Sequence, residues 1–116
     1  MLKVYHLSTC STCQRILKEL DIATKGAQMQ DIKTEAITTD QIDEMKALAG
    51  SYEALFSRTA MKYRSMGLGA KTLTEADYRQ LILDEYTFLK RPVIVSGQQI
   101  FIGNAPKTVA AAKAVL

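Results

Sequence analysis

The sequence predicts an α/β fold built on a mixed four-stranded sheet, with a block of helices inserted between the first and last strands. Three observations predict it. The chain opens with an apolar run, a helical pattern and a second apolar run, and it ends with two short apolar runs and an alanine-rich helix. Residues from about 38 to 90 show helical spacing. We expect the order β-α-β, helices, β-β-α in a single domain over residues 1–116.

The first segment is expected to form two strands joined by a helix. Leu2–Tyr5 is the first strand, Ser11–Leu20 the helix and Met29–Ile32 the second strand, with a turn around Gly26. Because a crossover helix joins the two strands, they should be parallel and the connection right-handed. The helix carries one apolar stripe, formed by Cys13, Ile16, Leu17 and Leu20.

The middle block contains two helices with clear start signals. Thr38 followed by Gln41 has the form of a capping box, and the helical spacing after it ends at Gly50, a residue suited to the position after a helix. Thr74, with an acidic residue three positions later, opens another helix that should run to about residue 83. Shorter helical turns are expected over residues 52–56, 58–66 and 84–89.

The last segment returns to strands. Val93–Val95 and Gln99–Ile102 flank Gly97, which favours a tight antiparallel hairpin. Pro106–Val115 has the composition of a helix, and Pro106 suits its first turn. Without the middle block, this order of elements is that of the thioredoxin and glutaredoxin fold.

The two cysteines of the chain form one C-x-x-C motif, Cys10-Ser11-Thr12-Cys13, at the start of the first helix. Between a strand and a helix, this motif is typical of thioredoxin-like redox chemistry. A thiolate at a helix N-terminus faces unpaired backbone N–H groups and the positive end of the helix dipole, which lower its pKa. A zinc site that includes His6 would need a carboxylate or water as fourth ligand, and a structural disulfide is not needed in a chain of this size. Both remain alternatives, but redox use is favoured and no metal is expected.

A proline directly before a strand is a second local signal. Pro92 follows Arg91 and precedes Val93–Val95. In thioredoxin-like folds a cis-proline at this place packs against the redox turn and exposes backbone groups to the substrate. The order of elements therefore favours a cis peptide bond here, although only about 5–6% of X-Pro bonds in folded proteins are cis.

The composition is that of an ordinary globular protein. The 116 residues can bury a core without disulfides or metals, and the formal net charge of +3 comes from scattered basic residues. The scatter argues against direct nucleic-acid binding, and no apolar run is long enough to cross a membrane. We expect a cytoplasmic monomer, in a compartment where thiols are kept reduced.

Three blocks of the sequence together resemble the ArsC family, which contains glutaredoxin-coupled arsenate reductases and Spx-type regulatory relatives. The blocks are Tyr5-His6-x-x-x-Cys10, Leu55-Phe56-Ser57-Arg58-x-x-x-x-Tyr63-Arg64-x-x-Gly67-Leu68 and Leu89-Lys90-Arg91-Pro92-Val93-Ile94. The likeness covers essentially the whole chain. It implies a thioredoxin-like fold with a helical insertion.

The resemblance also implies roles for individual residues. Cys10 matches the nucleophilic cysteine of the reductases, and His6 matches a histidine associated with lowering that thiol's pKa. Arg58 and Arg91 match two of three arginines that surround the oxyanion, where guanidinium groups suit tetrahedral anions. Asn104 stands near the place of the third arginine, and it carries no charge.

Two functions follow from the motif and the resemblance. The first is a thiol oxidoreductase that acts on a small oxyanion or a disulfide, with Cys13 resolving the adduct on Cys10. It binds no cofactor, uses glutathione as co-substrate and has glutathione, glutaredoxin or thioredoxin as redox partner. The second is an Spx-like redox-sensing transcription regulator that binds RNA polymerase, which Gly50 would contact. For the first, we assign substrate binding to Ser11, Thr12, Arg58, Arg91, Pro92 and Asn104.

Overall fold

A computed structural model describes residues 2–116. The chain forms two compact units, one made of residues 2–36 and 91–116 and the other of residues 37–90. The second unit coincides, to within one residue, with the helical insertion expected over residues 38–90.

The first unit is built on a mixed four-stranded sheet with the order β2-β1-β3-β4. Its strands are β1 (Leu2–His6), β2 (Gln28–Asp31), β3 (Val93–Ser96) and β4 (Gln99–Ile102). β1 and β2 are parallel, whereas β3 is antiparallel to both β1 and β4. The parallel first pair and the closing hairpin are therefore as expected, and β2 begins and ends one residue earlier than the sequence pattern indicated.

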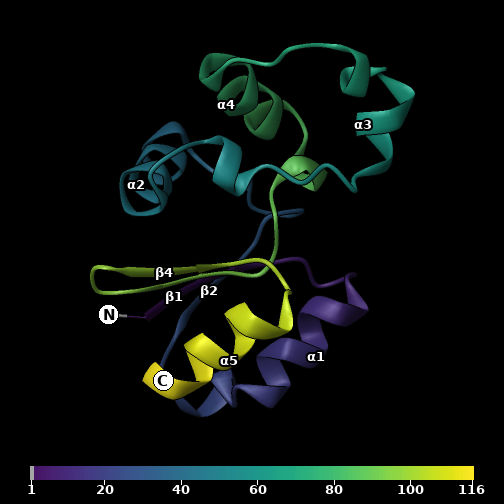
Figure 1. The fold of residues 1–116 in the computed structure, drawn as a ribbon. Coiled ribbons are helices and arrows are strands. Elements are labelled where there is room, and N and C mark those ends of the chain that lie inside the picture. The colour runs from purple at the N-terminus through teal and green to yellow at the C-terminus, as the bar shows by residue number, and fades with distance from the viewer. Residues whose placement is uncertain (1) are drawn as a thin grey trace. The chain divides into compact units, whose positions relative to one another are not determined.

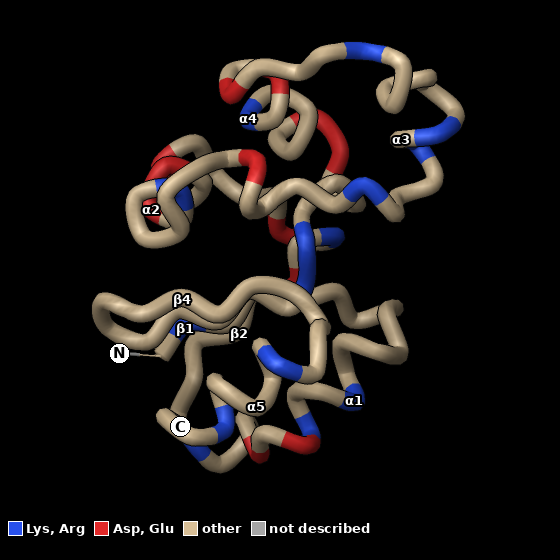
Figure 2. The backbone as a smooth tube through the Cα atoms, viewed as in Figure 1, with Lys and Arg blue, Asp and Glu red and all other residues tan. Residues whose placement is uncertain are grey.

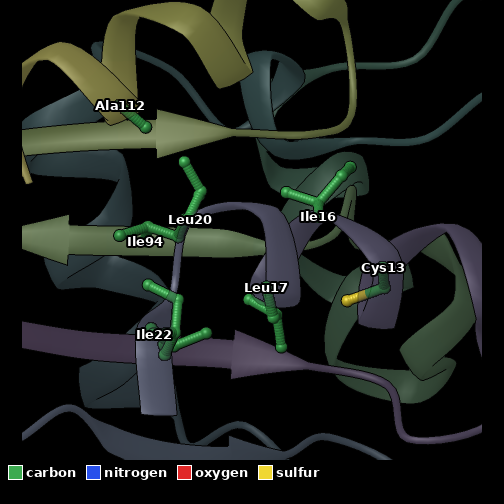
Figure 3. Packing of buried hydrophobic residues seen from close by; sticks show 8 residues of the cluster. Cys13, Ile16, Leu17, Leu20, Ile22, Ile94 and Ala112 are labelled. Carbon is green, nitrogen blue, oxygen red and sulfur yellow. The ribbon is translucent and has the colours of Figure 1, made fainter. Parts of the chain in front are cut away.

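Two helices of this unit, α1 (Ser11–Glu19) and α5 (Pro106–Val115), lie on the same face of the sheet (Figure 1). Their apolar sides and the strands enclose one core, whose packing Figure 3 shows. The apolar stripe expected along α1 is buried in full. The buried members of this core are Val4, Cys13, Ile16, Leu17, Leu20, Ile22, Ile94 and Ala112.

The second unit contains α2 (Thr39–Ala49), α3 (Met61–Ser65) and α4 (Glu75–Asp84). Both expected capping boxes are present: the side chains of Thr38 and Thr74 each accept a hydrogen bond from the backbone N–H three residues on, and their own backbone N–H groups donate to the side chain of that residue. These bonds satisfy N–H groups that the first turn of a helix leaves unpaired. The start of each long helix was therefore readable from its local sequence.

The two long helices of this unit are linked through a carboxylate on α2. Arg79 donates two hydrogen bonds to Asp43, at 2.8 and 3.1 Å, and the Tyr52 hydroxyl donates a third at 2.6 Å. Arg79 and, to a smaller extent, Tyr52 lower the pKa of Asp43 to about 2. The ion pair between Arg79 and Asp43 joins α2 to α4 at the surface. In the core of this unit, Phe56 stacks on Phe88 with ring centroids 5.0 Å apart.

The shorter elements differ from the expected helical turns in type and length. Residues 52–56 contain only the 3₁₀ turn Glu53–Leu55, and residues 84–89 only the 3₁₀ turn Tyr86–Phe88. A further 3₁₀ turn, Ile22–Thr24, had no sequence signal; it follows Asp21, whose φ of 56° is left-handed. Three-residue turns carry too little periodicity to be separated from α-helix by pattern.

Charged residues of both signs are interspersed along the backbone of both units (Figure 2). This distribution agrees with the scattered positive charge seen in the sequence. Among residues 2–116, no helix combines the length and the apolar character needed to cross a lipid bilayer.

Candidate functional site

Cys10 occupies the N-cap position of α1, with extended backbone angles of φ −92° and ψ 107°. Its N–H donates to the carbonyl oxygen of Leu7 at 3.0 Å, and its own carbonyl accepts from Gln14 N–H at 3.0 Å. These bonds close the turn between β1 and α1. The side chain is half-buried and makes no capping hydrogen bond, and its N-cap position places Cys10 at the positive end of the α1 dipole.

Cys13 lies one turn further along α1 and is fully buried in the core of this unit (Figure 3). Burial raises the pKa of its thiol above the ordinary value of 9.0, and negative charge on Cys10 or Asp31 raises it further. A hydrogen bond with the backbone of Leu7 and the positive charge of Arg91 lower the pKa of Cys13, but by less than burial raises it. Cys13 is therefore held as a neutral thiol, and both cysteines are free.

Arg91 and Pro92 are joined by a cis peptide bond, as the order of elements indicated. Pro92 is buried, and its carbonyl oxygen accepts a hydrogen bond from Gly103 N–H at 2.9 Å. The Nε of Arg91 is buried as well, and the charge of its guanidinium group acts on Cys13. The cis bond, Arg91 and the C-x-x-C turn thus belong to one unit and one site.

Asn104 follows Gly103 in the exposed turn between β4 and α5. Gly103 has a φ of 88°, a conformation that favours glycine, and this turn is fixed to the cis-proline by the bond from Gly103 to Pro92. The neutral amide of Asn104 therefore adds no positive charge to this end of the sheet. Ser11 and Thr12 form the first turn of α1, with Ser11 exposed and Thr12 half-buried.

His6 is the last residue of β1 and contacts α1 through Gln14. The Gln14 Nε2 lies 3.2 Å from His6 Nδ1 and donates to the Leu7 carbonyl oxygen at 3.0 Å. His6 is half-buried, and Asp31 is its register partner on the parallel strand β2. A hydrogen bond from Ser8 is the main reason that the pKa of Asp31 is lowered, and His6 adds a smaller effect in the same direction.

Arg58 belongs to the second unit. Its guanidinium group pairs with Glu53 at 2.7 Å, donates to the Tyr78 hydroxyl at 3.0 Å and lies over the Tyr78 ring, 5.7 Å from its centre. The pair with Glu53 raises the pKa of Arg58. Within the same unit Arg58 lines a pocket of about 850 Å³, together with residues such as Tyr63 and Arg64. A role for Arg58 at Cys10 stays a prediction.

Three participants were not singled out from the sequence. Gln14 and Asp31 act through side-chain contacts, and the Leu7 backbone bonds to Cys10, Cys13 and Gln14. Asp31 could have been found from its place at the end of a strand parallel to β1, because such strand ends meet at one edge of a sheet. Gln14 carried no comparable signal, since a polar residue in the second turn of a helix is common.

The arrangement is suited to thiol chemistry. Within residues 2–116, no three His, Cys, Asp or Glu side chains are placed to hold a metal ion. An accessible thiol at a helix N-terminus and a buried thiol one turn away are the parts that thiol–disulfide exchange requires.

The ArsC family model matches residues 5–112. The chain belongs to the ArsC family. The match includes both units and all the site residues named above, so the resemblance seen in the three sequence blocks is confirmed. No curated protein sequence matches the chain.

Several solved structures have a similar fold. An arsenate reductase from Vibrio cholerae is 18% identical with a TM-score of 0.79, covering 96% of each chain. An arsenate reductase (ArsC) related protein from Brucella melitensis is 20% identical with a TM-score of 0.72, covering 95% of this chain and 92% of the other. The Staphylococcus aureus protein SACOL0876 is 27% identical with a TM-score of 0.76, covering 96% and 97%. At the lower identities the likeness shows the thioredoxin-like fold alone.

Proposed function

We propose that the chain is an arsenate reductase-like thiol oxidoreductase in which Cys10 is the nucleophile and Cys13 the resolving thiol. The observation that carries the proposal is the contrast between the two cysteines: Cys10 is half-buried at the N-cap of α1, whereas Cys13 is fully buried with a raised pKa. A nucleophile must be reachable as a thiolate, and a resolving thiol must stay protonated until the adduct forms. Membership of the ArsC family supports the same chemistry.

The proposed reaction transfers two electrons from the two thiols to the oxidant. With a disulfide, the Cys10 thiolate attacks one sulfur, forms a mixed disulfide and releases the other sulfur as a thiolate. Cys13 then gives up its proton and attacks Cys10 Sγ, which releases the second thiolate and leaves a Cys10–Cys13 disulfide. With arsenate, Cys10 displaces an oxygen as water, and the attack of Cys13 on Cys10 Sγ leaves the arsenic reduced by two electrons.

Glutathione, glutaredoxin or thioredoxin is proposed to reduce the Cys10–Cys13 disulfide and complete the cycle. This step requires a reducing compartment such as the cytoplasm, because the regenerating thiols must be available in their reduced form. Arg91 is proposed to attract the anionic group of the substrate. Where the substrate is a disulfide of a peptide, the carbonyl and N–H groups around cis-Pro92 are proposed to bind the backbone of that peptide. His6 is proposed to assist Cys10 from the end of β1.

Two oxidants are supported by different observations. Arsenate is supported by the family and by the names of the similar structures. A disulfide is supported by the charges of the first unit, where the positive charge of Arg91 and the negative charge of Asp31 both act on Cys13 and Asn104 is neutral. A doubly charged oxyanion requires more positive charge than a neutral disulfide does.

The test is a coupled assay that follows NADPH oxidation with glutathione, glutaredoxin and glutathione reductase, using arsenate in one arm and a small disulfide in the other. Cys10→Ser is expected to abolish turnover in both arms, and Cys13→Ser to accumulate an adduct on Cys10. Thr39→Ala, which removes an exposed hydroxyl from α2, is the control and should keep full turnover. Retained turnover in Cys10→Ser would sink the proposal.

The alternative, an Spx-like regulator that binds RNA polymerase, rested in part on Gly50. In the structure Gly50 ends α2 with a φ of 97° and its N–H donates to the Lys46 carbonyl oxygen at 2.8 Å. A left-handed C-cap is sufficient reason for glycine there. No observation favours the regulator over the oxidoreductase.

A further inference from the structure

Gln14 joins the end of β1 to α1 by a single amide group. Its Nε2 donates to the Leu7 carbonyl oxygen at 3.0 Å and lies 3.2 Å from His6 Nδ1. The same Leu7 carbonyl accepts the N–H of Cys10, so the Gln14 amide and the backbone of Cys10 share one acceptor. Neither the family match nor the sequence motifs give Gln14 a role.

The chemistry of these contacts fixes the tautomer of His6. A carbonyl oxygen can only accept a hydrogen bond, so the Gln14 amide must turn its NH₂ group, and not its oxygen, toward Leu7. The second hydrogen of that NH₂ group is then available to His6 Nδ1. A ring nitrogen accepts a hydrogen bond only when it carries no proton, and the proton of neutral His6 must therefore be on Nε2.

Asp31 also lies beside His6, as its register partner on β2, and the Asp31 carboxylate is engaged by Ser8. A doubly protonated ring would place the Nδ1 proton against the NH₂ group of Gln14. The contact with Gln14 therefore suits a ring whose Nδ1 carries no proton.

We propose that Gln14 is a positioning residue that holds His6 as the Nε2–H tautomer, so that His6 serves Cys10 as a hydrogen-bond donor and not as a base at Nδ1. The proposal deepens the proposed function and rests on Cys10 being the nucleophile. It also defines how His6 acts: its Nδ1 lone pair is occupied, and its Nε2–H is the group left to stabilise negative charge. The contact that orients the ring comes from α1, whose N-cap is Cys10 and whose first turn contains Cys13.

The test measures the tautomer directly, because His6 is the single histidine of the chain. A long-range ¹H–¹⁵N correlation spectrum of the full chain without a histidine tag, at about pH 8 where imidazole is neutral, reports which ring nitrogen carries the proton. The wild type should show the Nε2–H form. Gln14→Glu, which has the same shape but can only accept, should move the proton to Nδ1, and Gln14→Met should give a mixture of tautomers. Gln80→Met removes an amide from α4 and should leave the spectrum unchanged.

The functional readout is the rate at which iodoacetamide alkylates Cys10, measured on the Cys10 peptide by mass spectrometry. Gln14→Met should slow this rate about three- to tenfold, the equivalent of one hydrogen bond. An Nδ1–H tautomer in the wild type, or a tautomer insensitive to both Gln14 variants, overturns the assignment. A changed tautomer with an unchanged alkylation rate overturns the positioning role. Failure of the proposed function itself would appear separately, as turnover that persists in Cys10→Ser.

Discussion

The unequal burial of the two cysteines predicts a large difference in their reactivity toward an alkylating reagent. Cys13 has no exposed surface and packs among the core residues of the first unit, so iodoacetamide reaches it only when the start of α1 opens. Cys10 at the N-cap needs no such opening. The prediction is that native protein is labelled at Cys10 much faster than at Cys13.

The magnitude follows from the cost of opening. Local opening of a core helix costs a substantial part of the global stability of about 5–15 kcal/mol, and taking about 3 kcal/mol as a minimum gives a rate ratio of at least about 100. The raised pKa of Cys13 increases the ratio, because less of the buried thiol is present as the reactive thiolate.

The assay is pulsed alkylation at about pH 8, followed by digestion and quantification of the singly labelled peptides. In denaturant both cysteines should react at similar rates, which controls for intrinsic reactivity. A native ratio below about ten would refute the reasoning, because Cys13 would then be nearly as accessible as Cys10.

Further predictions concern the fold. Ile16→Ala should lower the free energy of unfolding by about 2–5 kcal/mol in urea titrations because Ile16 is fully buried, whereas Val115→Ala on the surface should cost under about 0.5 kcal/mol; equal effects would contradict the packing. Asp43, with its pKa of about 2 in the folded state, contributes stability that is present above its ordinary value of 3.8 and lost as the pH falls through 2. Asp43→Asn should therefore reduce the slope of the free energy of unfolding against pH between pH 2 and pH 3.8. An unchanged slope would exclude the contact with Arg79 in solution. Thr38→Ala should cost about 1 kcal/mol by loss of a helix cap, most of which Thr38→Ser should restore; no loss in the alanine variant would argue against the cap.

The fold was readable from the sequence because its signals are local. The apolar stripe of α1, the caps at Thr38 and Thr74 and the glycine turn of the last hairpin each lie within a few residues of the element they define. The C-x-x-C motif and the proline at residue 92 could be placed in the same way, since each precedes an element whose type was clear.

The parts of the site that could not be read depend on contacts between distant elements. Nothing within α1 shows that Gln14 reaches back to His6, and part of the negative charge that acts on Cys13 comes from Asp31 on β2. The partners of Arg58 are a further example, because the sequence did not indicate its contacts with Glu53 and Tyr78, and its role in substrate binding stays a prediction.

The most direct test of the central claim is to identify the products formed when reduced protein reacts with glutathione disulfide. Mass spectrometry of the wild type should show loss of the two thiol hydrogens and a Cys10–Cys13 linked peptide. Cys13→Ser should carry glutathione on Cys10, and Cys10→Ser should remain unmodified. Glutathione on Cys13 in the Cys10→Ser variant, or a wild type that never forms the internal disulfide, would contradict the assignment of nucleophile and resolving thiol.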